Sequence, residues 1–168
     1  MKEAIIRRAA EHDLPEMLNL YRHLHPHEAQ LEPATAERVW SNLLTSNFMT
    51  VIVAQAAEQL VSSCTLAIVP NLSRGGRSYG VIENVVTHAD HRKLGLGRRV
   101  LAHALDVASQ ADCYKVHLAT GSKREATLRF YEEVGFERGG KTYFEVRREV
   151  ALSGRHVGNW PSADQSGA

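Results

Sequence analysis

Apolar positions recur along the chain with two different spacings, which predict helices interleaved with strands. A spacing of three to four residues places apolar side chains on one helical face, and it predicts helices over 14–24, 34–46, 97–110 and 122–135. Runs rich in Val, Ile and Leu predict strands over 3–9, 48–70 (two strands joined by a turn near Ala57–Gln59), 79–88, 113–120 and 141–150. This order predicts an α/β (α+β) fold with a mixed central sheet and helices on both of its faces.

Local signals mark where several of these helices begin and end. Asp13 can cap the first helix, Pro15 suits its first turn, and Glu16 stands three residues after Asp13 as in a capping box. Gly135 follows the last helix at a position suited to a left-handed residue. These signals favour helical boundaries close to those that the apolar spacing gives.

Length and composition indicate one ordinary globular domain. The chain has 168 residues, with 43% hydrophobic and 23% charged residues and a formal net charge of +1, so no chain-wide basic field indicates nucleic acid. We expect a single domain over 1–150 and a loose tail over 151–168, where periodicity is lost. The charged N-terminus lacks the apolar run of a signal peptide, no run is long enough to span a membrane, and Cys64 and Cys113 form no framework. These features predict a cytoplasmic protein with two buried free thiols.

The segment His91–Ala108, HRKLGLGRRVLAHALDVA, contains the first candidate site. Between a strand and a helix it reads Arg-x-x-Gly-x-Gly from Arg92 to Gly97, which is neither the GxxxxGK[ST] phosphate loop nor the GxGxxG dinucleotide pattern. Glycines let a backbone approach a ligand closely, and free amides at a helix start favour an anion such as a pyrophosphate. A plain turn with solvated arginines is the alternative.

Two stretches in this order resemble the GNAT (Gcn5-related) N-acetyltransferases. ENVVTHADHRKLGLGRRVL, residues 83–101, is similar to that family's cofactor strand, Arg/Gln-x-x-Gly-x-Gly/Ala turn and following helix. REATLRFYEEVGF, residues 124–136, resembles its later helix, which often ends in Phe-Tyr-Glu-x-x-Gly-Phe. The resemblance extends over roughly residues 3 to 148. It implies a GNAT-like, mostly antiparallel sheet whose strands splay at an acetyl-CoA site.

The resemblance also implies which residues hold acetyl-CoA. The pyrophosphate would rest on the backbone of the glycine turn, and the pantetheine arm would pair with the strand before it. A departure occurs at Lys123 and Arg124, where the family often has Asn; these basic side chains either meet a phosphate or are a solvated helix start. The expected cofactor-binding residues are Val85, Val86, Thr87, Arg92, Lys93, Leu94, Gly95, Leu96, Gly97, Arg98, Lys123 and Arg124.

Acetyl transfer needs a proton acceptor for the amine, an oxyanion donor and an acid for the leaving sulfur. Tyr131 matches the tyrosine that often serves as the acid in the resembled family; a core tyrosine bonded to backbone is the alternative. Glu83 is the candidate base, expected to be desolvated with a raised pKa, or else a structural carboxylate that binds backbone or Arg77. The Val86 amide is the candidate oxyanion donor.

Histidines crowd the loop after the first helix, at His23, His25 and His27. They alternate beside a proline, with no carboxylate or cysteine spaced to complete a metal site, so no metal is expected. In the resembled fold this loop lines the acceptor pocket, which makes His25, His27, Glu28 and Asn84 the candidate substrate contacts. His88 and His91 are expected to flank the cofactor turn.

The leading functional hypothesis is an N-acetyltransferase that moves an acetyl group directly from acetyl-CoA to a primary amine of a small molecule or an N-terminus. A non-catalytic acyl-CoA-binding sensor with the same fold is the alternative. A nucleic-acid binder that uses Arg92 to Arg99 is disfavoured by the near-neutral chain and the lack of stacking aromatics. We expect a homodimer, the default for small enzymes, and no membrane partner.

Overall fold

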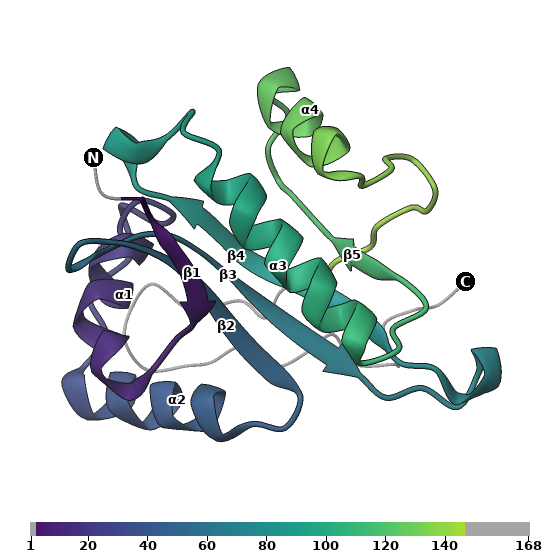
Figure 1. Ribbon diagram of the computed structural model, residues 1–168, viewed down its shortest axis with the longest axis horizontal. Helices are drawn as coiled ribbons and strands as arrows, with labels where there is room; N and C mark the ends of the chain where they lie inside the picture. The colour runs from purple at the N-terminus through teal and green to yellow at the C-terminus, as the bar shows by residue number, and fades with distance from the viewer. Residues whose placement is uncertain (1–2, 147–168) are drawn as a thin grey trace, which may run out of the picture. The chain divides into compact units, whose positions relative to one another are not determined.

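The computed structural model describes residues 3–146, and its centre is a five-stranded sheet in the order β1-β2-β3-β4-β5 (Figure 1). The strands are β1 (Ile5–Arg8), β2 (Met49–Ala56), β3 (Gln59–Val69), β4 (Tyr79–Thr87) and β5 (Val116–Leu118). The first three pairings are antiparallel, and β4 and β5 are parallel. The predicted mixed, mostly antiparallel sheet is therefore confirmed.

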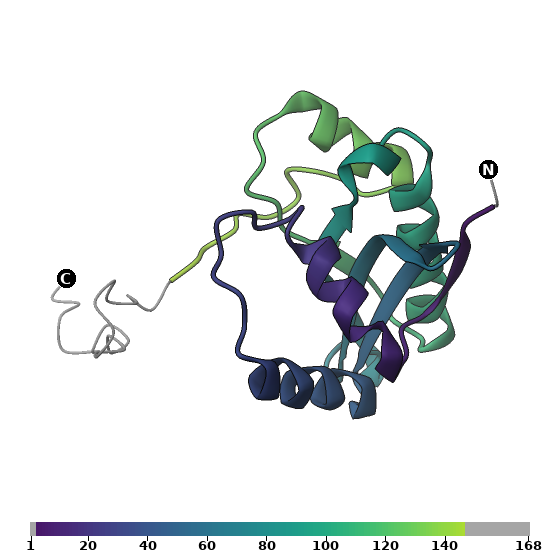
Figure 2. The same cartoon turned by 90° about the vertical axis from the view of Figure 1, so that its left-hand side faces the viewer.

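Helices cover both faces of this sheet, as the sequence predicted (Figures 1 and 2). The helices α1 (Leu14–Tyr21) and α2 (Pro33–Thr45) lie on one face, and α3 (Leu96–Gln110) lies on the other, with α4 (Glu125–Val134) following β5. Each face has its own apolar core. One core joins Met17, Leu20 and Trp40 to the sheet, and the other joins Val100, Leu101 and Ala104 to it.

The parallel pairing of β4 and β5 determines where the glycine turn lies. Parallel neighbours need a crossover connection, and here α3 provides it between the end of β4 and the start of β5. The N-terminus of α3 therefore lies beside the C-terminal end of β4. In open sheets this edge is where ligands commonly bind.

The capping role predicted for Asp13 is wrong. Its carboxylate makes no cap bond to α1 but accepts two hydrogen bonds from Arg7, at 2.6 and 2.8 Å, and one from the Ala10 amide at 2.7 Å. Arg7 holds the pKa of Asp13 below its usual value, with the Ala10 amide acting in the same direction against the effect of burial. A guanidinium brought in by β1 thus outcompetes the local box with Glu16.

One helical face and one strand also differ from the sequence prediction, in which the apolar spacing of the second helix places Val39 inward. Val39 is exposed while Trp40 next to it is buried, because the Trp40 indole donates to the Glu11 carbonyl at 3.1 Å. The strand predicted over 141–150 is absent from its described part, residues 141–146. An isolated extended segment is stable only with a partner strand, and no described strand pairs with these residues.

Residues up to Glu137 form one compact unit, and residues 138–146 belong to a second unit that is described by itself. In the second unit the Tyr143 hydroxyl donates to the Glu145 carboxylate at 2.9 Å. The predicted tail over 151–168 lies outside the described residues. Over residues 3–146, no helix combines the length and the apolar character that a bilayer crossing requires.

Candidate active site

The strands β4 and β5 separate in the middle of the sheet. They pair only from Gly80 to Ile82, opposite Val116–Leu118, whereas β4 continues to Thr87. The backbone of residues 83–87 therefore has no strand partner on that side within the part of the chain that the structure describes. An unpaired edge of this kind offers amide and carbonyl groups to an extended ligand.

A β-bulge lies at the point where the strands separate. Thr65 pairs with Glu83 and Ser63 pairs with Val86, so two residues of β4, Asn84 and Val85, face one residue of β3. Asn84 has a φ of 54°, a left-handed conformation that asparagine tolerates better than most residues. Bulges re-aim side chains and are common next to active sites.

The turn before α3 presents a set of free backbone amides. Lys93 and Gly95 both have positive φ, 64° and 75°, and the first hydrogen bond of the helix runs from the Arg99 amide to the Gly95 carbonyl at 3.1 Å. The amides of residues 93–98 donate to no carbonyl that the structure describes. Arg92 Nε donates to the Thr87 carbonyl at 3.2 Å and so fixes the turn to the end of β4. This concave set of amides at a helix N-terminus fits a phosphate group.

The two glycines of the turn have different structural roles. At Gly95 a Cβ would meet no atom within 4 Å, so the requirement there is the left-handed backbone. At Gly97 a Cβ would lie 3.1 Å from Phe130 Cζ and 3.2 Å from Thr87 Oγ1. Gly97 therefore allows α3, α4 and the end of β4 to approach one another closely.

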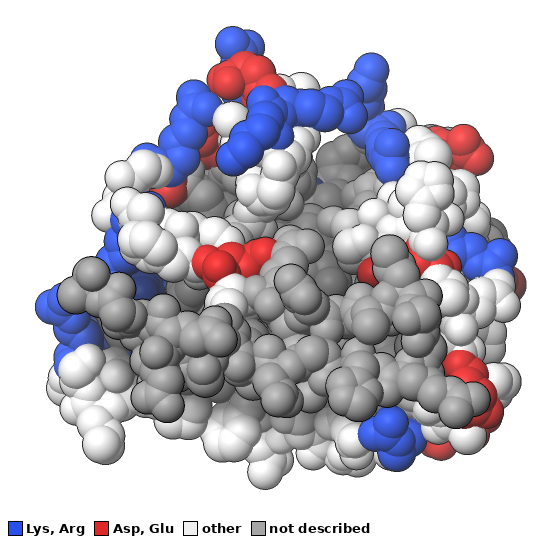
Figure 3. Space-filling model, turned by 180° about the vertical axis from the view of Figure 1, so that it is seen from behind, with Lys and Arg blue, Asp and Glu red and all other residues white. Residues whose placement is uncertain are grey.

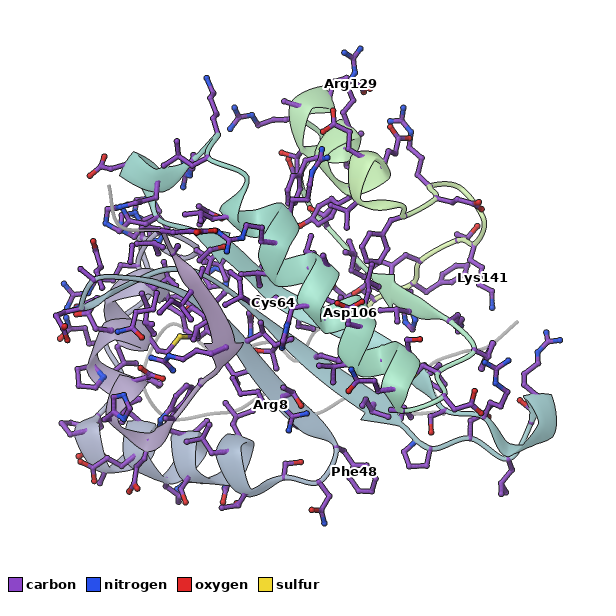
Figure 4. All side chains as sticks on the ribbon, viewed as in Figure 1. Arg8, Phe48, Cys64, Asp106, Arg129 and Lys141 are labelled. Carbon is purple, nitrogen blue, oxygen red and sulfur yellow. The ribbon has the colours of Figure 1, made fainter. Side chains whose placement is uncertain are left out.

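Positive side chains lie in this turn and at the start of α4. Arg92, Lys93, Lys123 and Arg124 are exposed, and Lys and Arg side chains gather along the upper rim when the molecule is viewed from behind (Figure 3). Arg129 on α4 points outward from the same end of the molecule (Figure 4).

Arg98 is already engaged by another group. Its Nη2 lies 2.5 Å from Glu133 Oε2, in an ion pair that joins the first turn of α3 to the last turn of α4. A phosphate bound at the turn would have to share this guanidinium with Glu133.

Tyr131 lies in the aromatic layer between α4 and the sheet. Its ring centroid is 5.0 Å from that of Phe130 and 6.3 Å from that of Phe136. Burial raises the pKa of Tyr131, and the charges of Cys64 and Glu83 raise it further. Its hydroxyl has no hydrogen-bond partner among residues 3–146, so the alternative of a core tyrosine bonded to backbone finds no support there. A protonated phenol remains available to a ligand.

Glu83 differs from the sequence expectation in its environment. The side chain is exposed rather than desolvated, because β5 has already separated from β4 at this position. The alternative partner Arg77 is instead bonded to Asp112, with Nε 3.0 Å from Oδ1. Glu83 forms no hydrogen bond or ion pair with another described residue, yet it is close enough to Tyr131 for its charge to raise the pKa of that phenol.

The opposite face of the bulge holds a polar group that sequence reasoning missed. The Tyr21 phenol of α1 faces Thr65 and Asn84, and burial raises the pKa of Tyr21. The hydroxyls of Ser63 and Thr65 are buried and have no hydrogen-bond partner in the described part of the chain. The available signal was the run Ser-Ser-Cys-Thr, residues 62–65, which places hydroxyl side chains within an otherwise apolar strand.

The candidate acceptor residues lie in the segment between α1 and α2. His25, His27 and Glu28 are exposed there, and Asn84 is exposed at the bulge; their contact with a substrate stays a prediction. Within residues 3–146, no three His, Cys, Asp or Glu side chains are grouped as a metal would require.

Comparison with known proteins identifies the family. The profile described as "Acetyltransferase (GNAT) family" matches residues 14–136. The chain belongs to the GNAT acetyltransferase family. The match includes α1, β4, the glycine turn and α4, and therefore the whole of the candidate site. Family membership implies acetyl-CoA as co-substrate.

Curated relatives with a stated substrate are glucosamine 6-phosphate N-acetyltransferases. The one from Trypanosoma brucei brucei is 37% identical over 86 residues, 51% of this GNAT chain and 56% of the relative. The one from Dictyostelium discoideum is 31% identical over 93 residues, 55% of this chain and 57% of the relative. The chain thus spans just over half the length of these two proteins.

Among solved structures, a protein of Agrobacterium tumefaciens str. C58 whose acetyltransferase name is itself provisional superposes with a TM-score of 0.82. It is 42% identical, and the match covers 86% of this GNAT chain and 99% of that one. Glucosamine-6-phosphate N-acetyltransferase from Arabidopsis thaliana has a TM-score of 0.77 at 19% identity, over 86% of this chain and 99% of its own, which shows the fold alone.

Proposed function

We propose that this protein is an acetyl-CoA-dependent N-acetyltransferase that acetylates the primary amine of a small molecule by direct transfer. The observation that carries the proposal is the unpaired edge of β4, which begins at Glu83 and leads to a turn with six free amides, with Tyr131 close enough for the charge of Glu83 to raise its pKa. The curated relatives make glucosamine 6-phosphate the first acceptor to test.

In this proposal the glycine turn holds the cofactor diphosphate. The amides of residues 93–98 donate to it, and Arg92 and Lys93 add positive charge beside it. The free edge from Glu83 to Thr87 pairs with the extended arm of the cofactor. Acetyl-CoA supplies an acetyl thioester at this edge.

The two side chains then move protons in opposite directions. Glu83 accepts a proton from the acceptor ammonium, directly or through water, which its exposure permits. As the nitrogen–carbon bond forms and the carbon–sulfur bond breaks, Tyr131 donates its proton to the departing sulfur. The second proton that the nitrogen loses on becoming an amide returns to Tyr131 through water, while the proton taken by Glu83 is released to solvent. A backbone amide on the free edge of β4 donates to the oxygen that gains negative charge.

A turnover assay tests this proposal. Thiol release from acetyl-CoA is measured with glucosamine 6-phosphate, glucosamine, an aminoglycoside, a polyamine and a peptide. The parent is compared with Tyr131→Phe and with the matched control Tyr114→Phe, whose hydroxyl lies outside the site. We expect turnover in the parent and the control, and a kcat lower by roughly 10²–10⁴-fold in Tyr131→Phe.

The outcomes separate the hypotheses. Acetyl-CoA binding without turnover on any acceptor would favour the sensor module, and equal kcat in Tyr131→Phe would remove the acid role. The homodimer is a separate prediction, to be measured by sedimentation equilibrium.

A further inference from the structure

Three imidazole rings pack together where α1 meets the cofactor turn. His23 follows the end of α1, and its ring centroid lies 4.0 Å from that of His88. The His88 ring lies 5.3 Å from that of His91, edge to face. His88 caps the short helical turn Ala89–His91 that leads into the glycine turn, and His91 is its last residue. We refer to His23, His88 and His91 as the histidine cluster.

At two of these rings, His88 and His91, the surroundings of Nδ1 match a nitrogen that carries no proton. His88 Nδ1 accepts a hydrogen bond from the Asp90 amide at 3.2 Å, and a proton on that nitrogen would remove the acceptor. His91 Nδ1 is buried and has no hydrogen-bond partner among the described residues. A cationic His91 would hold an N–H there with nothing to receive it.

Burial and charged neighbours also favour the neutral form of His23. Burial lowers the pKa of His23, and His88 and Arg92 lower it further, while Asp90 acts in the opposite direction. Asp90 is exposed and lies 3.9 Å from His88 Nδ1, so it is a weak counter-charge for the cluster. A second or third positive charge among these rings therefore has little to balance it.

The cluster joins two parts of the candidate site that are distant in sequence. Immediately after His23 the chain enters the segment that carries His25, His27 and Glu28, and immediately after His91 it enters the turn with the free amides. Packing of the rings against one another therefore also keeps the segment after His23 next to the cofactor turn.

We propose that His23, His88 and His91 are positioning residues that fix the end of α1 on the cofactor turn while the His23 ring is neutral, and that His23 releases this contact when its ring becomes charged. We call the contact between His23 and His88 the joint. The effect of the joint on catalysis rests on the proposed function, but the existence of the joint does not. His23 binds a proton less readily in the folded than in the unfolded chain, so its contribution to stability is complete above the ordinary histidine pKa of about 6.5 and declines as the pH falls.

Hydrogen exchange measured without substrate tests the joint. Backbone exchange over residues 20–30 and 86–95 is compared at pH 7.5 and 5.5, after correction for the intrinsic exchange rates. The parent is compared with His23→Ala, with His23→Phe, which keeps an aromatic ring that cannot become charged, and with the control His12→Ala. His12 has a side chain that is 78% exposed and lies outside the cluster.

We expect both segments of the parent to exchange faster at pH 5.5, by at most about tenfold, because this pH lies only about one unit below the ordinary histidine pKa of the unfolded chain. His23→Ala should exchange fast at both pH values, His23→Phe should be protected at both, and His12→Ala should follow the parent. Equal protection of the parent at the two pH values would overturn the proposal. So would acid-dependent loss of protection in His23→Phe, or unchanged protection in His23→Ala.

A second measurement connects the joint to catalysis. With the best acceptor of the turnover assay, the acceptor KM of the parent should rise from pH 7.5 to 5.5 more steeply than that of His23→Phe, while kcat changes in parallel in both. Absence of turnover would contradict the proposed function. The hydrogen-exchange result would still show whether the contact between His23 and His88 depends on pH.

Discussion

Replacing Gly97 by alanine tests the close approach of α3, α4 and β4. The new Cβ would lie 3.1 Å from Phe130 Cζ and 3.2 Å from Thr87 Oγ1, closer than ordinary van der Waals contact. Overpacking of this kind costs about 1–3 kcal/mol, and the higher helix propensity of alanine returns at most about 1 kcal/mol. We therefore expect Gly97→Ala to lower the free energy of unfolding by about 1–2 kcal/mol, measured by urea unfolding.

A double-mutant cycle shows whether Phe130 causes this loss. Phe130→Leu removes the Cζ atom, so adding Gly97→Ala to it should cost at least about 1 kcal/mol less than adding Gly97→Ala to the parent. Gly95→Ala is the matched comparison: its cost, about 1–2 kcal/mol for a left-handed backbone, should be independent of Phe130 because no atom lies within 4 Å of the added Cβ. Additive effects of Gly97→Ala and Phe130→Leu, or a Gly97→Ala variant as stable as the parent, would refute the packing argument.

Three further predictions concern charged residues. Glu83→Gln should lower kcat without changing acetyl-CoA affinity and should remove the acidic limb of the pH–rate profile; an unchanged profile would exclude Glu83 as the base. Asp13→Asn should lower the free energy of unfolding by roughly 1–3 kcal/mol at pH 7; because Arg7 lowers the pKa of Asp13, this difference should shrink as the pH falls below about 4, and a difference constant down to pH 2 would count against the pair. Arg98→Ala should hardly change stability, since an exposed ion pair such as that with Glu133 contributes at most about 1 kcal/mol, but should weaken acetyl-CoA binding; unchanged affinity would assign Arg98 to the ion pair alone.

The sequence predicts the sheet and its helices because their apolar spacing is regular. The helix α3 begins one residue before the predicted start, and β4 matches its predicted range to within one residue. The strand over 141–150 was wrong in its described part because alternation indicates a half-buried face but says nothing about whether a partner strand is available.

The candidate site was less predictable than the fold. The glycine turn is contiguous, so its residues could be read directly from Arg92 to Gly97. The exposure of Glu83 and the pairing of Arg77 with Asp112 depend on where β5 leaves β4, which is a long-range property. The packing of His23 against His88 joins residues 65 positions apart and has no local signature.

The buried thiol of Cys64 bears on whether acetyl transfer passes through an acyl-enzyme. Cys64 lies on β3 opposite the bulge, fully buried, and burial raises its pKa to about 12. The thiolate is the nucleophilic form of cysteine, and at neutral pH this side chain supplies almost none. We therefore expect no acyl-enzyme at Cys64, in agreement with the proposed direct transfer from acetyl-CoA to an acceptor bound at the same time. Initial-rate kinetics should accordingly give intersecting rather than parallel double-reciprocal lines.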